Sequence, residues 1–342
     1  MGAYFFCDFT KWWPLPAESV KENSMLQDVI STFTRMKRYK FTGETIQCDL
    51  CGSAERDIVG RRDRYGNPLQ TCLCRGCGLV FTSPMPTDLE VDDFYRRFYR
   101  KSYHNAYKPT AKALLRAERG AVSRCEAIRP ALKHGARVLD VGSASGNFVR
   151  FMADQGYDSM GIEPNRGFAE YSRTENGINV QATIWQEAEV EDGSIDVITA
   201  NHVVEHFRSP IAALQTFHRW LKPGGAVYIS VPNVYNPDRT PYGRFHFAHV
   251  YNFTRETLIM LALKSGFEMS EDYPGDSTNI LFFRRDVPVE DWQIYPDVYA
   301  KLKTYFATYT NRRYFFSAKP YARWVHRMRK LGGDMIKVKA AS

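Results

Sequence analysis

Residues 138–146 have the composition of a segment that could cradle a ligand at the end of a strand. An aliphatic run containing Asp140 is followed by a turn of small residues that includes Gly142, Ala144 and Gly146. A strand, a tight turn and a helix in this order let backbone N–H groups and a helix N-terminus approach a bound ligand closely. The small residues matter because a bulky Cβ would block that approach.

A second acidic residue, Glu163, stands 23 positions after Asp140, where the next predicted strand ends. A carboxylate at such a strand end can accept hydrogen bonds from both hydroxyls of a ribose. Further strands are predicted at 195–201 and 226–232, and residues 202–206 are expected to open the helix between them. The pattern of alternating strands and helices predicts an α/β fold with a parallel sheet.

These segments, taken together, resemble the class I S-adenosylmethionine-dependent methyltransferases. The resemblance rests on the Asp140-x-Gly-x-Ala-x-Gly turn, on Glu163, on the Glu205-His206 pair and on the Leu-Lys-Pro-Gly-Gly turn at 221–225. It covers about residues 115–285 and implies a Rossmann-like, doubly wound, mostly parallel sheet. A purely structural strand–turn–helix is the alternative for the first segment taken alone.

The resemblance also implies roles in cofactor binding. Asp140 is expected to orient the amino-acid end of S-adenosylmethionine, and Glu163 its ribose. Thr183 stands where the family often places an acidic adenine contact, so this contact is expected to be weak. The predicted cofactor-binding residues are Asp140, Gly142, Ala144, Gly146, Glu163, Thr183, Asn201 and His202.

Three histidines, His249, His246 and His206, are candidate catalytic bases. A side chain that titrates near pH 7 suits removal of a proton from a sugar hydroxyl. His206 equally fits a packing or capping role, and His249 equally fits a hydrogen bond at a helix start. Ubiquinone-pathway O-methyltransferases can hold a divalent metal in a similar Glu-x-x-Glu-His cluster. Here His202 replaces the first acid, so metal-assisted catalysis is not expected.

Four cysteines form two Cys-x-x-Cys pairs, Cys48 with Cys51 and Cys74 with Cys77, with 22 residues between the pairs. Each pair is followed by a glycine, and two such knuckles supply the four thiolates of a tetrahedral structural zinc site. Cys72 is an alternative ligand with poorer spacing. Disulfides are the other alternative, but no secretory signal is recognised, which favours a reducing compartment.

The residues after Cys77 narrow the resemblance further. The sequence continues Gly-Leu-Val-Phe, then Pro84-Met-Pro, and reaches a tyrosine-rich stretch with Tyr95 and Tyr99. This arrangement is similar to that of methyltransferases from polysaccharide and sugar-nucleotide gene clusters, which implies a saccharide or sugar-nucleotide acceptor. Too little chain follows residue 285 for the additional domain of the C-methylating branch, so oxygen is the expected methyl acceptor.

The net charge of +8 is concentrated near the C-terminus, because residues 297–342 contain eleven Lys and Arg against two Asp. The rest of the chain is close to neutral. A basic tail of this kind fits an anionic surface, such as a membrane or polyphosphate, and equally fits a helical extension docked on its own domain. No apolar stretch approaches the roughly 20 residues that span a bilayer, and a cytoplasmic protein is expected.

The sequence therefore divides into five predicted segments. These are an N-terminal extension (1–44, where Met25 is an alternative start), a zinc-ribbon-like module (45–84), a Tyr-rich helical linker or lid (85–115), the methyltransferase domain (116–286) and a basic helical extension (287–342). An RNA-directed methyltransferase or RNA binder is one alternative, but residues 200–203 lack the Asn/Asp-Pro-Pro-aromatic loop of base amino-group methylases, so nucleic acid is not favoured. A non-catalytic scaffold that retains the fold is the other.

Overall fold

The structure is a computed structural model. It describes residues 39–94, 111–235, 240–241, 243–275, 277–286, 292–322 and 324–325. Most of the predicted N-terminal extension, including Met1 and Met25, lies outside these ranges. So do the tyrosine-rich residues Tyr99, Tyr103, His104 and Tyr107 and the last part of the basic tail, residues 326–342.

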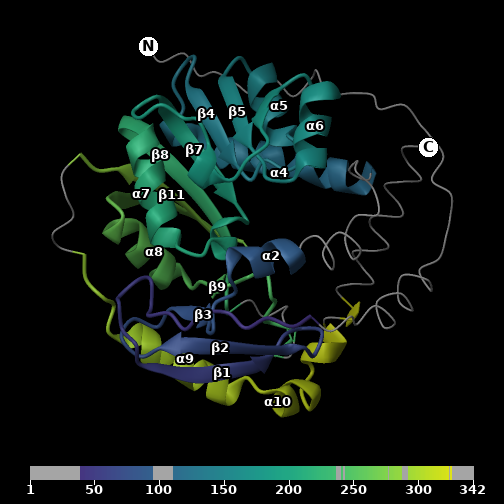
Figure 1. Cartoon of the computed structure of the whole chain (residues 1–342), viewed down its shortest axis with the longest axis vertical. Helices are drawn as coiled ribbons and strands as arrows, with labels where there is room; N and C mark the ends of the chain where they lie inside the picture. The colour runs from purple at the N-terminus through teal and green to yellow at the C-terminus, as the bar shows by residue number, and fades with distance from the viewer. Residues whose placement is uncertain are drawn as a thin grey trace.

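A seven-stranded sheet forms the larger part of the molecule (Figure 1). Its strands lie in the order β10-β11-β8-β7-β4-β5-β6. Neighbouring strands from β8 to β6 are parallel, whereas β11 is antiparallel to both β8 and β10. The strands are β4 (Arg137–Val141), β5 (Asp158–Ile162), β6 (Asn179–Gln181), β7 (Ile195–Asn201), β8 (Leu221–Pro232), β10 (Phe267–Tyr273) and β11 (Ser277–Arg284). The predicted doubly wound, mostly parallel sheet is confirmed.

Helices cover this sheet on both sides of its middle strands. Helix α5 packs against α4 and against β4 and β5, α6 packs against β6, and α7 and α8 pack against β8 and β10, respectively (Figure 1). The helices are α4 (Ala111–Ile128), α5 (Asn147–Asp154), α6 (Arg166–Thr174), α7 (Pro210–Trp220) and α8 (Arg255–Lys264), with short 3-10 turns η3 (Arg129–Ala131) and η4 (Trp185–Glu187). Side-chain oxygens cap three of the N-termini, from Asn165, Ser209 and Thr254.

The expected helix opening at residues 202–206 is wrong. His202 has a positive φ of 57°, and only a single 3-10 turn, η5 (Val204–His206), follows it. The α-helix begins at Pro210, because Ser209 accepts a hydrogen bond from the Ala212 N–H and proline favours the first helical position. The fifth parallel strand also starts earlier than predicted, at Leu221, with residues 222–225 forming an irregularity in its pairing with β7.

A smaller antiparallel sheet contains the predicted cysteine module. Its order is β1 (Arg56–Arg62), β2 (Pro68–Cys74), β3 (Val80–Thr82) and β9 (Tyr251–Asn252). Strand β9 lies between β8 and α8 in the sequence. The small sheet therefore takes its last strand from the part of the chain that also builds the seven-stranded sheet. Helix α2 (Asp88–Phe94) lies between the two sheets (Figure 1). The centroids of the Phe94 and Phe247 rings are 4.5 Å apart.

The first part of the basic extension is docked on the small sheet. Helices α9 (Asp297–Thr308) and α10 (Asn311–Phe315) lie along its outer side (Figure 1). The Tyr299 hydroxyl donates to Asp57 Oδ2 at 2.6 Å, and the buried Arg244 guanidinium lies over the rings of Tyr305 and Phe306 at 4.7 and 4.9 Å. For this part of the tail, the docked alternative is confirmed.

None of the helices in the described ranges is both long enough and apolar enough to cross a bilayer.

The contact between α9 and β1 predicts a pH-dependent contribution to stability. Hydrogen bonds from Tyr299 and then Arg75 lower the pKa of Asp57 to about 2. This contribution is present above pH 4 and is lost as the pH falls toward 2, because protonated Asp57 no longer accepts the charge-assisted bonds. We expect Tyr299→Phe to lower the free energy of unfolding at pH 6, measured by urea denaturation, and the difference from wild type to shrink below pH 4.

Tyr321→Phe is the matched control, because Tyr321 stacks on Trp324 and lies apart from Asp57. A Tyr299→Phe difference of constant size from pH 6 to pH 3 would contradict this assignment.

Candidate active site

The turn after β4 brings the backbone close to its neighbours. Gly142 and Gly146 have positive φ angles of 74° and 71°. A Cβ built on Gly142 would lie 2.2 Å from Val203 Cγ1, and one on Gly146 would lie 2.3 Å from Ile178 Cδ1. Any side chain at either position would therefore both strain the backbone and clash, so the sequence needs glycine at both.

Asp140 is only 2% exposed and is held by two donors. Its Oδ1 accepts from Arg124 Nη1 at 2.8 Å and from Thr199 Oγ1 at 2.6 Å. Burial raises the pKa of Asp140, while the Arg124 charge and the two hydrogen bonds lower it. Arg124 also lies over the Phe148 ring at 4.4 Å. The result is a carboxylate and a guanidinium side by side at the carboxyl end of β4.

Glu163 supports the same turn from the end of β5. Its Oε2 accepts from the Ala144 N–H and its Oε1 from the Asn165 N–H, both at 2.8 Å. Burial raises the pKa of Glu163, and these two backbone hydrogen bonds oppose the rise. The carboxylate therefore fixes the turn, and its predicted contact with a ribose stays a prediction.

A cavity of about 890 Å³ opens at this edge of the sheet. The predicted cofactor-binding residues that line it are Asp140, Gly142, Ala144, Asn201 and His202. Gly146, Glu163 and Thr183 are not among its lining residues; the Thr183 hydroxyl is 3.4 Å from the Glu187 carboxylate.

The far wall of the cavity comes from elements that sequence reasoning did not connect to the site. Arg124 on α4, Tyr228 and Ser230 on β8 and Asn279 on β11 all line it. The Ser230 hydroxyl donates to Asn279 Oδ1 at 2.8 Å. No motif signals these residues, because Arg124 depends on the packing of α4 and Asn279 meets Ser230 only through the antiparallel pairing of β11 with β8.

Beyond His202, at the same edge, three further side chains converge. Glu205, His206 and His249 offer donor atoms that lie within 4.8 Å of one another. The His206 Nδ1 contacts the Ala248 carbonyl oxygen at 2.7 Å, and the His206 and His249 rings are 4.9 Å apart. Two of the three predicted catalytic histidines are therefore together, along with Glu205, which was not among the predicted site residues.

The third predicted base, His246, is buried behind His249. Its ring lies 5.3 Å from the His249 ring and 6.0 Å from the Phe94 ring, and its Nδ1 accepts from the Ala248 N–H at 3.3 Å. His246 therefore packs beneath the cluster and is poorly placed to meet an acceptor molecule.

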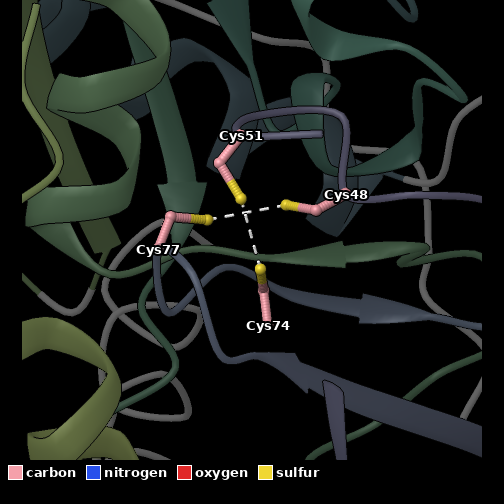
Figure 2. Close-up of side chains that lie close together, drawn as sticks. All are labelled: Cys48, Cys51, Cys74 and Cys77. Carbon is pink, nitrogen blue, oxygen red and sulfur yellow. Dashed lines mark hydrogen bonds between the residues drawn. The ribbon is translucent and has the colours of Figure 1, made fainter. Parts of the chain in front are cut away.

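The four predicted zinc ligands also converge, and Figure 2 shows their thiols pointing toward a common centre. The Cys48 and Cys77 sulfurs are 3.5 Å apart, and those of Cys51 and Cys74 are 3.4 Å apart, with all four free of disulfide bonds. A hydrogen bond from Cys48 is the main cause that lowers the pKa of Cys74 to about 7. Cys72 is buried outside the cluster.

Comparison with known proteins agrees with the fold of the larger sheet. Residues 112–271 match the family described as "Methyltransferase domain". A ubiquinone biosynthesis O-methyltransferase of Pseudomonas aeruginosa is 34% identical over 105 residues, which cover 29% of this chain and 45% of that protein. The protein of the same name from Aliivibrio fischeri is 33% identical over 105 residues, with the same coverage. The aligned region thus spans less than half of these relatives.

Among solved structures, a 1,6-didemethyltoxoflavin-N1-methyltransferase from Burkholderia thailandensis aligns over 61% of this chain and 96% of its own. Its sequence identity is 19% and its TM-score 0.46. The family match covers the strands that build the cavity, from β4 through β8, together with α4, which supplies Arg124. Residues 112–271 therefore match a methyltransferase domain in sequence, and their strand order is that of the class I methyltransferase fold.

Proposed function

We propose that this chain transfers the methyl group of S-adenosylmethionine to a hydroxyl oxygen of a small-molecule acceptor. The observation that carries the proposal is the single cavity in which the glycine turn, the Asp140–Arg124 pair and His202 meet. In open α/β sheets, ligands bind outside the carboxyl ends of the strands, where this cavity lies.

The charges at the cavity suit the amino-acid end of S-adenosylmethionine. This end carries an ammonium and a carboxylate, and Asp140 and Arg124 offer the complementary pair, already 2.8 Å apart. The polar backbone of the turn at 142–145 would lie along the rest of the cofactor. Glu163, whose oxygens each bond one N–H, retains lone pairs for a ribose hydroxyl.

The reaction needs little covalent chemistry from the protein. The acceptor oxygen attacks the sulfonium methyl in line, so that an O–C bond forms as the C–S bond breaks, and the hydroxyl proton must leave. The Glu205–His206–His249 cluster adjoins His202, which lines the cavity, and we assign the removal of this proton to the cluster. Oxygen rather than carbon as acceptor agrees with the names of the relatives.

For the acceptor, we favour a saccharide or sugar nucleotide, on the resemblance of the first half of the chain to polysaccharide-cluster methyltransferases. The relatives' names make an intermediate of ubiquinone biosynthesis the second candidate. Assaying methyl transfer to both classes separates them. The RNA alternative would show instead as a salt-sensitive RNA complex, and the scaffold alternative as cofactor binding with no turnover.

We further propose that the four-cysteine cluster holds a structural Zn²⁺. Zinc–sulfur bonds of about 2.3 Å in a tetrahedron place the sulfurs about 3.8 Å apart, and the cluster shows 3.4 and 3.5 Å across its two closest pairs. Small adjustments would admit the ion.

Asp140 is the residue at which the cofactor assignment is tested. Asp140→Asn keeps the side-chain shape but removes the charge that faces the cofactor ammonium, so we expect S-adenosylmethionine affinity to fall about 30- to 150-fold, as one charge-assisted hydrogen bond is worth about 2–3 kcal/mol. Isothermal titration calorimetry measures this, and circular dichroism checks the fold. Asp158→Asn, at the exposed start of β5, is the matched control. Equal affinities in both variants would refute the cofactor assignment.

The proposed role of His249 in the reaction is tested by removing its side chain. We expect His249→Ala to reduce kcat about 100-fold or more, the usual range for loss of proton-transfer assistance, while S-adenosylmethionine affinity stays at the wild-type value. His134→Ala removes an exposed histidine at the start of β4 and should retain full activity. Wild-type turnover in His249→Ala would remove this residue from the reaction.

The zinc site is tested by removing one of its four thiols. Cys51→Ser should lose one zinc ion per chain by mass-spectrometric metal analysis and should lower the thermal midpoint, because structural zinc contributes folding free energy directly. Cys72→Ser, at a buried cysteine two residues from Cys74 but outside the cluster, should keep its zinc. Zinc-free wild-type protein would end this assignment.

A further inference from the structure

The cavity edge contains a buried carboxylate that no donor satisfies. Glu205 is 1% exposed, and neither of its oxygens has a hydrogen-bond partner among the described residues. The His202 Nδ1 lies 3.6 Å and the His206 Nε2 lies 3.9 Å from its Oε1. A carboxylate removed from water in this way is strongly destabilised unless a cation pairs with it.

The neighbouring imidazole of His206 is oriented to present a lone pair. Its Nδ1 lies 2.7 Å from the Ala248 carbonyl oxygen, and a carbonyl oxygen can only accept, so Nδ1 carries the hydrogen. In the neutral ring the other nitrogen, Nε2, is then an acceptor, and this nitrogen is the one near Glu205. An N–H bonded to a backbone carbonyl is the usual support of a metal-binding histidine.

The third donor comes from a different part of the chain. His249 lies in the segment that leads into β9, where its N–H donates to the His246 carbonyl oxygen at 3.0 Å. Its donor atom is within 4.8 Å of those of Glu205 and His206. The segment 202–206 supplies Glu205 and His206 but, in the sequence, lacks a further acid beside them. The fold adds His249 in its place.

The spacing fits an ion better than a proton shared between the side chains. Charge-assisted hydrogen bonds are about 2.7–2.9 Å long, whereas the Glu205 Oε1 lies 3.9 Å from the His206 Nε2. Metal–ligand bonds of about 2.0–2.2 Å allow donor atoms to lie as much as about 4.3 Å apart, so a small contraction of the cluster would close around an ion.

We propose that Glu205, His206 and His249 bind one divalent first-row transition-metal ion beside the cofactor cavity. Two imidazoles and one carboxylate favour Zn²⁺, Fe²⁺, Co²⁺ or Mn²⁺ over Mg²⁺ and Ca²⁺, which prefer oxygen donors. Three protein ligands leave coordination positions open for an exogenous oxygen.

This inference deepens the proposed function and rests on it for its chemical meaning. A bound ion of this kind lowers the pKa of an oxygen ligand. His202 lines the cavity and its Nδ1 lies 3.6 Å from Glu205, so the three ligands adjoin the cavity through His202. With the ion in place, His206 and His249 act as ligands, and the fall in kcat expected of His249→Ala then comes from loss of the ion.

The test uses tag-free full-length protein loaded with zinc at the cysteine cluster and titrated with Co²⁺. We expect one further equivalent to bind with visible d–d absorption bands and without the intense thiolate-to-cobalt bands of cysteine ligation. Glu205→Gln and His249→Ala should each weaken Co²⁺ binding about 100-fold or more while zinc stays at one per chain. His134→Ala should bind Co²⁺ as wild type does.

Glu205→Gln is nearly isosteric, and His249→Ala alters a half-buried side chain, so at least one folded variant is expected, with S-adenosylmethionine affinity as a check of the domain. No second equivalent in wild type, or undiminished binding in both variants, would overturn the site. Co²⁺ binding with no turnover on any hydroxyl acceptor would refute the proposed function but leave the site. Turnover by wild-type protein that binds no second ion would support the proposed function and overturn the metal site.

Discussion

The close contact between Gly142 and Val203 determines how the turn after β4 and the turn after β7 are placed at the cavity. Because a Cβ on Gly142 would lie 2.2 Å from the Val203 side chain, the turn after β4 and the turn after β7 can approach this closely only with glycine there. The approach places His202 on the cavity wall and Glu205 behind it. The His202 N–H, bonded to the Ser230 carbonyl oxygen at 2.8 Å, fixes the second turn to β8.

The position of His249 depends on the cysteine module. Residues 245–252 run along that module, with the Phe245 carbonyl oxygen accepting from the Arg64 N–H and the Val250 carbonyl oxygen from the Thr82 N–H, both at 2.8 Å. Strand β9 then pairs with β3. His249 lies inside this tethered segment, so a metal ion that rigidifies the cysteine module would also fix one side of the active site.

The first part of the basic tail, helix α9, also packs against these two parts of the chain. Arg244, 7% exposed, is enclosed by aromatic rings of α9, whose Tyr299 is bonded to Asp57 of β1. Past α9, large side chains such as Phe316 and Tyr321 are exposed beside Arg312 and Lys319. Contact of the tail with an anionic surface stays a prediction, since residues 326–342 lie outside the described ranges.

Local chemistry in the sequence determined much of this protein. Glycines that only a tight turn explains, an acid at each of two strand ends and two Cys-x-x-Cys knuckles were sufficient to predict the doubly wound sheet, the turn after β4 and the four converging thiols. Each of these signals lies within a few residues, or in a spacing tied to one chemistry. The helix predicted from residue 202 was wrong because the Ser209 cap and Pro210 place the helix start later.

Only the tertiary structure decided which distant side chains meet. Arg124 reaches Asp140 because α4 packs beside β4, Asn279 reaches Ser230 because β11 inserts antiparallel beside β8, and His249 reaches Glu205 because its segment is bound to the cysteine module. These contacts join residues that are far apart in the chain. They depend on strand order and on packing between layers, which no local pattern of residue types encodes.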